Sequence, residues 1–467
     1  MGFTKTLAQW IAGVEYESLP PEVTPWVKAA VTDYLAVALA GCPSQGIEIV
    51  KRHVLAEYAR GKGTLIGEPE RVSAEGAALF NGTLSHWEEY DDATYGMSGH
   101  PSVVIMPALF AAAEIFGAAG RDFVTAYAAG VEVCAKVGRL VNPQSIVLGY
   151  HPTAILGTLG AAAAVAKICK LDARQTETAL GIAASHSSGL RPHMGSMVKP
   201  LHAGLASRGG LAAAMLAREG FVGAENLIEG KHGFANAFSG GKPGDFEALA
   251  ARIGKPLEIL DPGIAFKIFP SNFHTQAGVV AVLQMAKAEG VKPAEVESIR
   301  CLANHMIQHS LWNANPRTGL EGKLSLHFCI AAALVDGQLE VEQFRDERVR
   351  DPLIRELMGR LTIEPHPAMA KLDFTKGRDF LGMEVIIKLK SGRTVSRHIT
   401  SGFSVPALDG ARLHPELIAK FVRNAKRVLP DRRIDECIDR IERLDASSAM
   451  ADFLEPLRHD RRAQRNS

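Results

Sequence analysis

The sequence predicts a mainly α protein, with a large all-helical domain and a smaller inserted α+β domain. Stretches of helical period, rich in alanine and leucine, dominate the first half of the 467-residue chain. β-Branched and aromatic residues become more frequent near Pro256, and the helical pattern returns after Gly402. We therefore expect residues 1–256 to form the first part of the helical domain, 257–401 the small domain, and 402–467 the C-terminal helices that return to the helical domain.

Caps and helix breakers place the elements of the first part. Prolines precede a helix that stops at Gly41, and Asp122 and Asp172 are expected N-caps because their side chains can accept hydrogen bonds from free backbone N–H groups. A short strand is expected at 63–67. The expected helices are 20–41, 45–59, 73–90, 101–116, 122–141, 152–170, 172–187 and 201–219.

The smaller domain contains the alternating runs that are typical of strands. The clearest is a hairpin at 383–400, in which two runs meet at Ser391-Gly392. Further strands are expected within 257–270 and at 295–303. Helical period predicts helices at 275–289, 324–336 and 351–361 in this domain, and at 414–429 and 431–457 after it.

Composition excludes several classes of partner. The net charge of +1 gives no global field for nucleic acid or membrane surfaces, so neither is an expected partner. The six cysteines are far apart and form no CxxC pair, which argues against a clustered metal site and a disulfide framework and indicates a reducing compartment, here the cytoplasm. The longest uncharged window, 141–166, has too short an apolar part to span a bilayer.

Residues 86–101, HWEEYDDATYGMSGHP, form the segment with the most unusual chemistry. It combines four carboxylates with two histidines between an amphipathic run and an apolar one: Glu88, Glu89, Asp91, Asp92, His86 and His100. Paired acids and bases at the mouth between two helices suit proton transfer. The alternative is a solvated helix end followed by a capped turn.

Histidines and cations recur in later segments, next to glycine or proline. His151 precedes Pro152 at a helix start, where the helix dipole favours the neutral imidazole; a simple capping role is the alternative. Arg191 and Lys199 lie in a segment that ends at another helix start, and both could hold carboxylates. Lys267, in an apolar run, either snorkels outward or supplies a partly desolvated cation.

Together these residues describe a pocket with several cations and several imidazoles. That composition predicts a small polycarboxylate substrate handled by acid–base catalysis. The chain has no GxSxG, Walker A or HExxH motif, and no strand precedes its GTLGAA run, so nucleophilic, nucleotide and zinc schemes are not indicated. We expect neither a metal nor a cofactor.

Most of these residues fall in a series of segments spread over nearly the whole chain: HWEEYDDAT, GHPSVVIMPAL, YHPTAILGTLGAAAAVAK, MVKPLHAGLASRGG, AFKIFPSNFHTQ and TGLEGKLSLHF. In order and spacing this series resembles the MmgE/PrpD family, which includes 2-methylcitrate dehydratases, cis-aconitate decarboxylases and an iminodisuccinate epimerase. The resemblance implies a helical domain that carries a smaller α+β domain, usually as a homodimer.

The resemblance also implies roles for individual residues. His100 and His151 stand where the family has its active-site histidines, and Lys199 and Lys267 where it has two pocket lysines. Decarboxylase members present a tyrosine from the small domain, where this chain aligns Asn313. This departure disfavours decarboxylation more than proton abstraction.

The acidic segment departs from the family pattern as well. The typical sequence is Asp-aromatic-Asp/Asn-Asp-Thr, whereas this chain reads Glu89-Tyr90-Asp91-Asp92-Ala93 with the threonine displaced to Thr94. The longer carboxylate of Glu89 reaches further into the pocket. A smaller or differently placed substrate is therefore expected.

These implications combine into one mechanism. Lys199, Lys267 and Arg191 neutralise substrate carboxylates, with Thr94 as a further binding residue. One histidine removes the α-proton, while the second histidine, or a protonated Glu89 or Asp91, donates to the departing hydroxyl. We expect a cofactor-independent lyase, most simply a 2-methylcitrate dehydratase-like hydro-lyase. The alternatives are an epimerase, a decarboxylase, or a catalytically silent helical binding protein.

Overall fold

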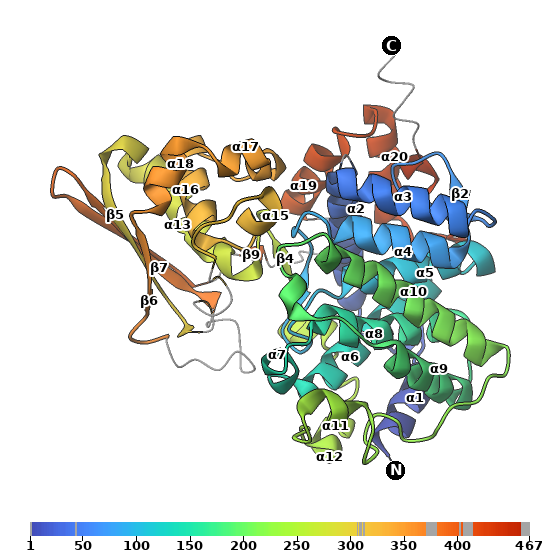
Figure 1. Ribbon diagram of the computed structural model, residues 1–467. Coiled ribbons are helices and arrows are strands. Elements are labelled where there is room, and N and C mark those ends of the chain that lie inside the picture. Colours follow the sequence, from blue (N-terminus) through green and yellow to red (C-terminus); the bar gives the residue numbers. More distant parts are fainter. Residues whose placement is uncertain are drawn as a thin grey trace.

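The computed structural model of the chain describes residues 2–42, 44–305, 307, 311, 313–369, 381–400, 403–404 and 414–458. A large helical body lies beside a smaller unit that carries a sheet (Figure 1). The predicted fold class, mainly α with a smaller α+β part, is confirmed. The helices of the body are α1 (Phe3–Gly13), α2 (Val23–Gly41), α3 (Gln45–Glu57), α4 (Ala74–Ser85), α5 (Ser102–Phe116), α6 (Gly120–Val141), α7 (Gln144–Val147), α8 (Pro152–Ile168), α9 (Ala173–His186), α10 (Val198–Arg218), α11 (Phe234–Ser239), α12 (Phe246–Ala250), α19 (Pro415–Ala425) and α20 (Asp431–Glu442).

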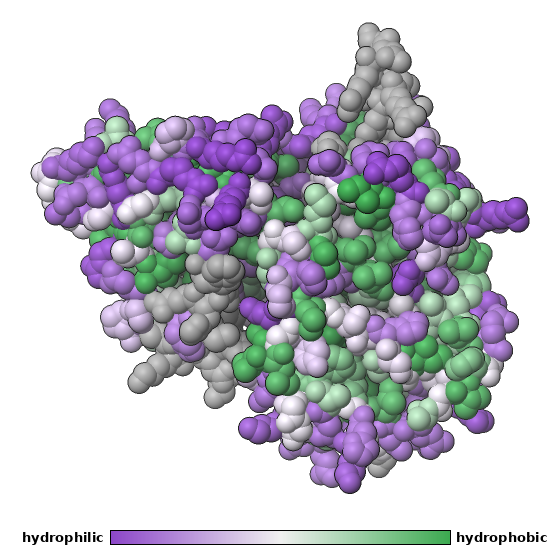
Figure 2. Space-filling model, viewed as in Figure 1, coloured by the Kyte–Doolittle hydropathy of each residue, from purple (hydrophilic) through white to green (hydrophobic). Residues whose placement is uncertain are grey.

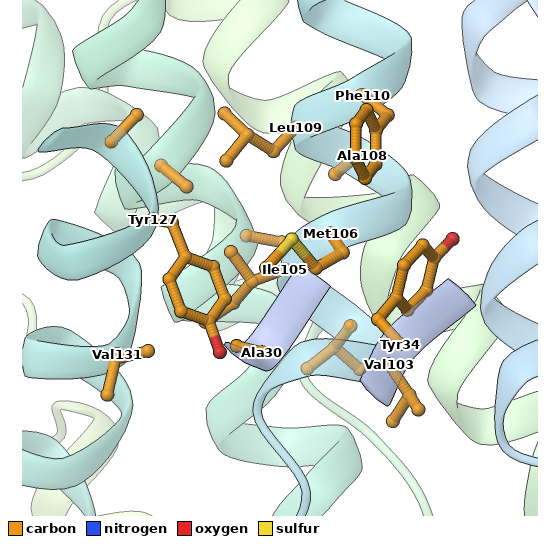
Figure 3. Packing of buried hydrophobic residues seen from close by; sticks show 14 of the residues in the cluster. Ala30, Tyr34, Val103, Ile105, Met106, Ala108, Leu109, Phe110, Tyr127 and Val131 are labelled. Atoms are coloured by element: carbon orange, nitrogen blue, oxygen red, sulfur yellow. The ribbon is translucent and has the colours of Figure 1, made fainter. Parts of the chain in front are cut away.

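The core of the body is built from both ends of the described chain. Its buried apolar residues run from Phe3 to Phe266 and resume from Leu417 to Leu457. Accordingly, α19 and α20 both pack against α2 (Figure 1). In Figure 3 the labelled side chains of α5 lie between Tyr34 of α2 and Tyr127 of α6, so α5 is a central element of this core.

Small residues let two helices of the body cross at very short range. A Cβ atom added to Gly82 on α4 would lie 2.8 Å from Cα of Gly204 on α10, so the two backbones nearly touch. This contact brings the C-terminal end of α4 close to the N-terminal turn of α10. The candidate site is built where these two helix ends meet.

The smaller unit has its own core around a four-stranded sheet of order β6-β5-β7-β8. β5 pairs in parallel with β6 and antiparallel with β7, which pairs antiparallel with β8. Alternate side chains of β7 are buried, as its sequence pattern predicts, and the predicted hairpin of β7 and β8 is confirmed. Its elements are α13 (Gln276–Glu289), β5 (Val296–Ala303), α15 (Gly319–Gly322), α16 (Leu326–Asp336), α17 (Asp346–Val349), α18 (Pro352–Met358), β6 (Leu361–Pro365), β7 (Met383–Leu389) and β8 (Thr394–Ile399).

A second sheet joins distant parts of the chain near the candidate site. β3 (Ala93–Thr94) pairs antiparallel with β4 (Ile264–Lys267), and β4 pairs with β9 (Phe403–Ser404). The register places Thr94 opposite Ile264. The end of the acidic segment is therefore fixed next to the strand that carries Lys267. The body also contains one short pair, β1 (Gly63–Thr64) and β2 (Arg71–Val72).

Several local predictions are wrong, among them the helix expected at 431–457, which ends at Glu442. The helix expected at 73–90 ends at Ser85, because the chain turns at His86 and Glu89 takes a left-handed backbone conformation with φ of 54°. Asp122 is not an N-cap: that position is taken by Ala119, whose N–H donates to the Asp122 carboxylate at 3.3 Å. Asp172 does cap its helix, because its carboxylate accepts a hydrogen bond from the Gln175 N–H.

The surface differs between the two parts. On the face in Figure 2, hydrophilic side chains dominate over the smaller unit, whereas hydrophobic patches extend over the helical body. Val147 and Leu148, at the end of α7, are 82% and 51% exposed. Among the described residues, no helix has both the length and the apolar character that crossing a membrane requires.

Candidate active site

A cavity of 1120 Å³ is lined by side chains from both the helical body and the smaller unit. Five of the predicted site residues line it, and they come from β3, from the segments before α5, α8 and α10, and from the first turn of α10: Thr94, His100, His151, Arg191 and Lys199. The other three, Glu89, Asp91 and Lys267, are buried. Glu89 and Asp91 contact Lys199 and His100 from behind, and Lys267 contacts these two carboxylates. All eight therefore belong to one constellation with two layers.

The acidic segment is not a solvated helix end, because its carboxylates are buried. Asp91 is 1% exposed, and its Oδ2 atom lies 2.9 Å from Nδ1 of His86 and 3.1 Å from Nδ1 of His100. Its Oδ1 atom lies 3.7 Å from the ammonium group of Lys267. Burial alone would raise the pKa of Asp91, but the two imidazoles and Lys267 hold it well below its usual value. Asp91 is thus a fixed carboxylate behind two histidines.

His100 presents one ring nitrogen to the cavity as a proton acceptor. Its Nδ1 atom faces two acceptors, the Asp92 carbonyl oxygen at 2.6 Å and the Asp91 carboxylate, so the ring proton resides on Nδ1. Nε2 consequently keeps its lone pair. Burial lowers the pKa of His100 to about 4, against the opposing effect of Asp91. At neutral pH the ring is uncharged and has the form a general base requires.

His151 occupies the N-cap position of α8 without capping it. Its side chain makes no cap hydrogen bond, so the capping alternative is wrong. Instead its Nδ1 atom lies 3.2 Å from Nδ1 of His202, which means that one ring donates and the other accepts. Burial lowers the pKa of His151 well below its usual value, and the nearby His86 lowers it further. The His86 ring is nearly parallel to it, with centroids 6.0 Å apart.

Two lysines meet the side chain of Glu89 from opposite elements. Lys199, in the first turn of α10, forms an ion pair with Glu89 and lies 3.1 Å from Nε2 of His86. Burial lowers the pKa of Lys199 well below its usual value, and the ammonium groups of Lys267 and Lys323 add to that effect. Lys267 donates to the Glu89 carbonyl oxygen at 2.9 Å and is 1% exposed. The outward-snorkelling alternative for Lys267 is therefore wrong.

Arg191 and Thr94 face the cavity with unused hydrogen-bonding capacity. Arg191 lies in a 3₁₀ turn, is half-buried, and forms no ion pair within the described part of the chain. The hydroxyl of Thr94 is buried and has no hydrogen-bond partner among the described residues. A ligand with a carboxylate and a polar group beside it would satisfy both.

Sequence reasoning omitted several residues from the site. His86 connects Asp91 to Lys199, and His202 contacts His151. His274 also lines the cavity, and burial lowers its pKa to about 4. Each of these histidines stands within a few residues of a predicted site residue. This proximity in the sequence was the signal that could have identified them. No group of three or more His, Cys, Asp or Glu side chains is arranged to hold a metal ion in the described ranges.

Comparisons with known proteins match most of the chain to one family. The profile of the MmgE/PrpD N-terminal domain matches residues 5–247, and that of the MmgE/PrpD C-terminal domain matches residues 269–443. The cis-aconitate decarboxylase of Mus musculus is 27% identical over 461 residues, 95% of this chain and 90% of the relative. That of Aspergillus terreus is 24% identical over 478 residues, 98% and 96% of the two chains. The 2-methylcitrate dehydratase of Cupriavidus necator is 24% identical over 378 residues, 76% of each.

Proposed function

The chain belongs to the MmgE/PrpD family, and from that premise we propose that it is a lyase acting next to a carboxylate of a small di- or tricarboxylic acid. The favoured reaction is the dehydration of a hydroxy-polycarboxylate similar to 2-methylcitrate, without a metal or cofactor. The observation that carries the proposal is the uncharged His100, whose Nδ1–H is fixed by Asp91 and Asp92 and whose Nε2 is left as an acceptor at the cavity.

The remaining residues supply the other parts of such a reaction. Arg191 binds a substrate carboxylate through its unpaired guanidinium, and Lys199 places an ammonium group near the carbanion or enediolate that develops beside it. His100 takes the α-proton on Nε2. His151 donates a hydrogen bond from its neutral ring to the departing hydroxyl, and the proton taken up by His100 passes to that hydroxyl, so water leaves and a carbon–carbon double bond forms. Thr94 orients the hydroxyl-bearing carbon.

Decarboxylation is the second candidate. The relatives of Mus musculus and Aspergillus terreus, which cover most of this chain, are both cis-aconitate decarboxylases by name. Asn313 lines the cavity from the smaller unit. By the family resemblance, it stands where decarboxylase members have a tyrosine. An amide cannot act as a phenolic proton donor, which favours dehydration for this chain. Epimerisation uses the same base, but the proton returns to the opposite face of the carbon and no hydroxyl leaves.

The test is proton NMR of the chelator-treated enzyme in deuterated water. The substrates are 2-methylcitrate, citrate, malate, cis-aconitate and an aspartate-derived imine. A new olefinic or vinylic-methyl signal without gas release means dehydration, and carbon dioxide release means decarboxylation. Deuterium incorporation at the α-carbon without net loss means epimerisation. If one of these acids binds but none of them reacts or exchanges, the chain is a silent binding protein instead.

A further inference from the structure

One buried lysine outside the cavity makes every hydrogen bond that its ammonium group can donate. Lys420, on α19, is 4% exposed and does not line the cavity. Its Nζ atom donates to the carboxylate of Asp33 on α2 at 2.6 Å, to the carbonyl oxygen of Tyr90 at 2.7 Å and to that of Lys267 at 3.0 Å. Three donors meet three acceptors, so the ammonium group is fully satisfied.

Two of these acceptors are backbone atoms of the segments that build the rear layer of the site. Tyr90 stands between Glu89, which pairs with Lys199, and Asp91, which contacts His100. Lys267 places its own ammonium group against both carboxylates. Lys420 therefore ties together, at their main chains, two segments whose side chains face the reacting groups.

Helix α19 also contacts the hydroxyl end of the Tyr90 side chain. Arg423, one turn after Lys420, donates to the Tyr90 hydroxyl at 2.8 Å, and that hydroxyl donates to the carbonyl oxygen of Ile268 at 2.8 Å. The ammonium group of Lys420 also lies 3.8 Å from the centroid of the Tyr90 ring, within range of a cation–π interaction. Helix α19 thus fixes Tyr90 at its carbonyl, its ring and its hydroxyl.

We propose that Lys420 is a positioning residue, which holds from the C-terminal helix the backbone on which Asp91 and Lys267 face His100. It acts only through these residues, because it reaches neither the cavity nor the His100 ring. The inference rests on the proposed function insofar as His100 is the base of that reaction. The arrangement it describes, however, exists without any substrate.

The test therefore reads the tautomer of His100 rather than turnover alone. Lys420→Met alone would leave the Asp33 carboxylate buried without its cation, so it is combined with Asp33→Asn. Nitrogen-15 NMR of histidine-labelled protein distinguishes a proton on Nδ1 from one on Nε2, and the His100 signals are assigned by their loss in His100→Gln. Lys426→Met, an exposed lysine at the C-cap of the same helix, is the matched control.

We expect His100 to be protonated on Nδ1 in the native protein and in Lys426→Met. It should populate both tautomers in the folded double variant. With an accepted substrate, kcat of the double variant should fall by up to about 10²-fold with little change in KM, the effect of misplacing a reacting group.

A folded double variant that keeps the native His100 tautomer would show that Lys420 is merely structural and would overturn the proposal. If the double variant does not fold, Lys420→Met with Asp33→Leu replaces the ion pair by apolar side chains, and its His100 tautomer is judged by the same criterion. Absence of turnover with every acid would refute the proposed function but leave the tautomer result unaffected.

Discussion

Two clusters of buried charge lie in the helical body and differ in how completely their groups are paired. In the first, around α6, Glu258 accepts from Lys136 at 2.8 Å and from Arg139 through both oxygens at 2.9 Å. Glu132 accepts from the backbone N–H groups of Gly254 and Glu258 at 2.7 and 2.8 Å. Every carboxylate oxygen of this cluster has a donor, and none of its residues lines the large cavity.

The second cluster, around His86 and Asp91, leaves capacity unused at the cavity wall. His100 keeps a lone pair on Nε2, Thr94 has an unpartnered hydroxyl, and Arg191 has no ion pair within the described part of the chain. The contrast teaches that buried charge alone does not mark a site. What marks it is buried charge that leaves donors and acceptors unsatisfied next to a cavity.

The largest effect is expected where the unused lone pair is removed. His100→Gln keeps the size of the side chain but removes the base, so kcat/KM should fall by about 10²–10⁴-fold while the protein remains folded. Stopped or coupled assays with the substrate found by NMR measure kcat/KM, and thermal unfolding shows whether the variant is folded. Activity near the native value would mean that another group is the base.

The pH dependence of the native enzyme is the control for this assignment. A base acts only when deprotonated, and burial lowers the pKa of His100 to about 4 from its ordinary 6.5. The His100-dependent rate should therefore stay constant as the pH falls through 6.5 and decline only near pH 4. A decline centred near 6.5 would contradict the burial of this ring.

The paired cluster should respond in stability and not in catalysis. Lys136→Met removes one partner of a buried ion pair, and we expect a loss of about 3 kcal/mol in unfolding free energy, at the low end for such changes because Arg139 remains on Glu258. Activity per folded molecule should be unchanged. Denaturant unfolding with the exposed Lys287→Met as control measures the loss; a selective fall in kcat would break the distinction between the two clusters.

Arg191→Met tests the unpaired guanidinium. A lost charged hydrogen bond is worth about 1.5–3 kcal/mol, so KM should rise by roughly ten- to a hundredfold. Stability should stay close to native, since no carboxylate of the described chain loses a partner. Arg174→Met, an exposed arginine on α9, is the matched control. Loss of fold together with unchanged KM would assign Arg191 to structure.

The smallest effect is expected at Thr94. Thr94→Val removes a neutral hydroxyl whose hydrogen bond to substrate is worth about 0.5–1.5 kcal/mol, so KM should rise roughly three- to tenfold. Because the hydroxyl is buried without a partner, its removal should not lower the melting temperature. Thr362→Val, on the exposed strand β6, serves as the comparison. A lower melting temperature with native KM would show a structural role.

Local sequence signals account for the elements more fully than for the site. The hairpin of β7 and β8 follows from alternation, and Asp172 caps its helix as expected, because both depend on neighbouring residues. The end of α4 at Ser85 was missed, because the buried partners of His86 and Asp91 favour a turn over the helical pattern. Those partners come from elsewhere in the chain.

Most residues of the two layers of the site could be identified from the sequence, but their contacts with one another could not. The resemblance to a family supplied His100, His151, Lys199 and Lys267. It did not show that Lys199 lies next to His86, 113 residues away, or that His151 faces His202 rather than capping α8. Lys420 offered no signal at all, because a lysine on an amphipathic helix is ordinarily solvated.

The pair of Asp33 and Lys420 joins residues 387 positions apart. During synthesis α2 emerges before α19, so the Asp33 carboxylate is made long before its lysine partner. A nascent chain, or one terminated prematurely before α19, has the histidines and the acidic segment but lacks the helix that supports them from behind. The support of the acidic segment from behind is thus completed only after α19 has been synthesised.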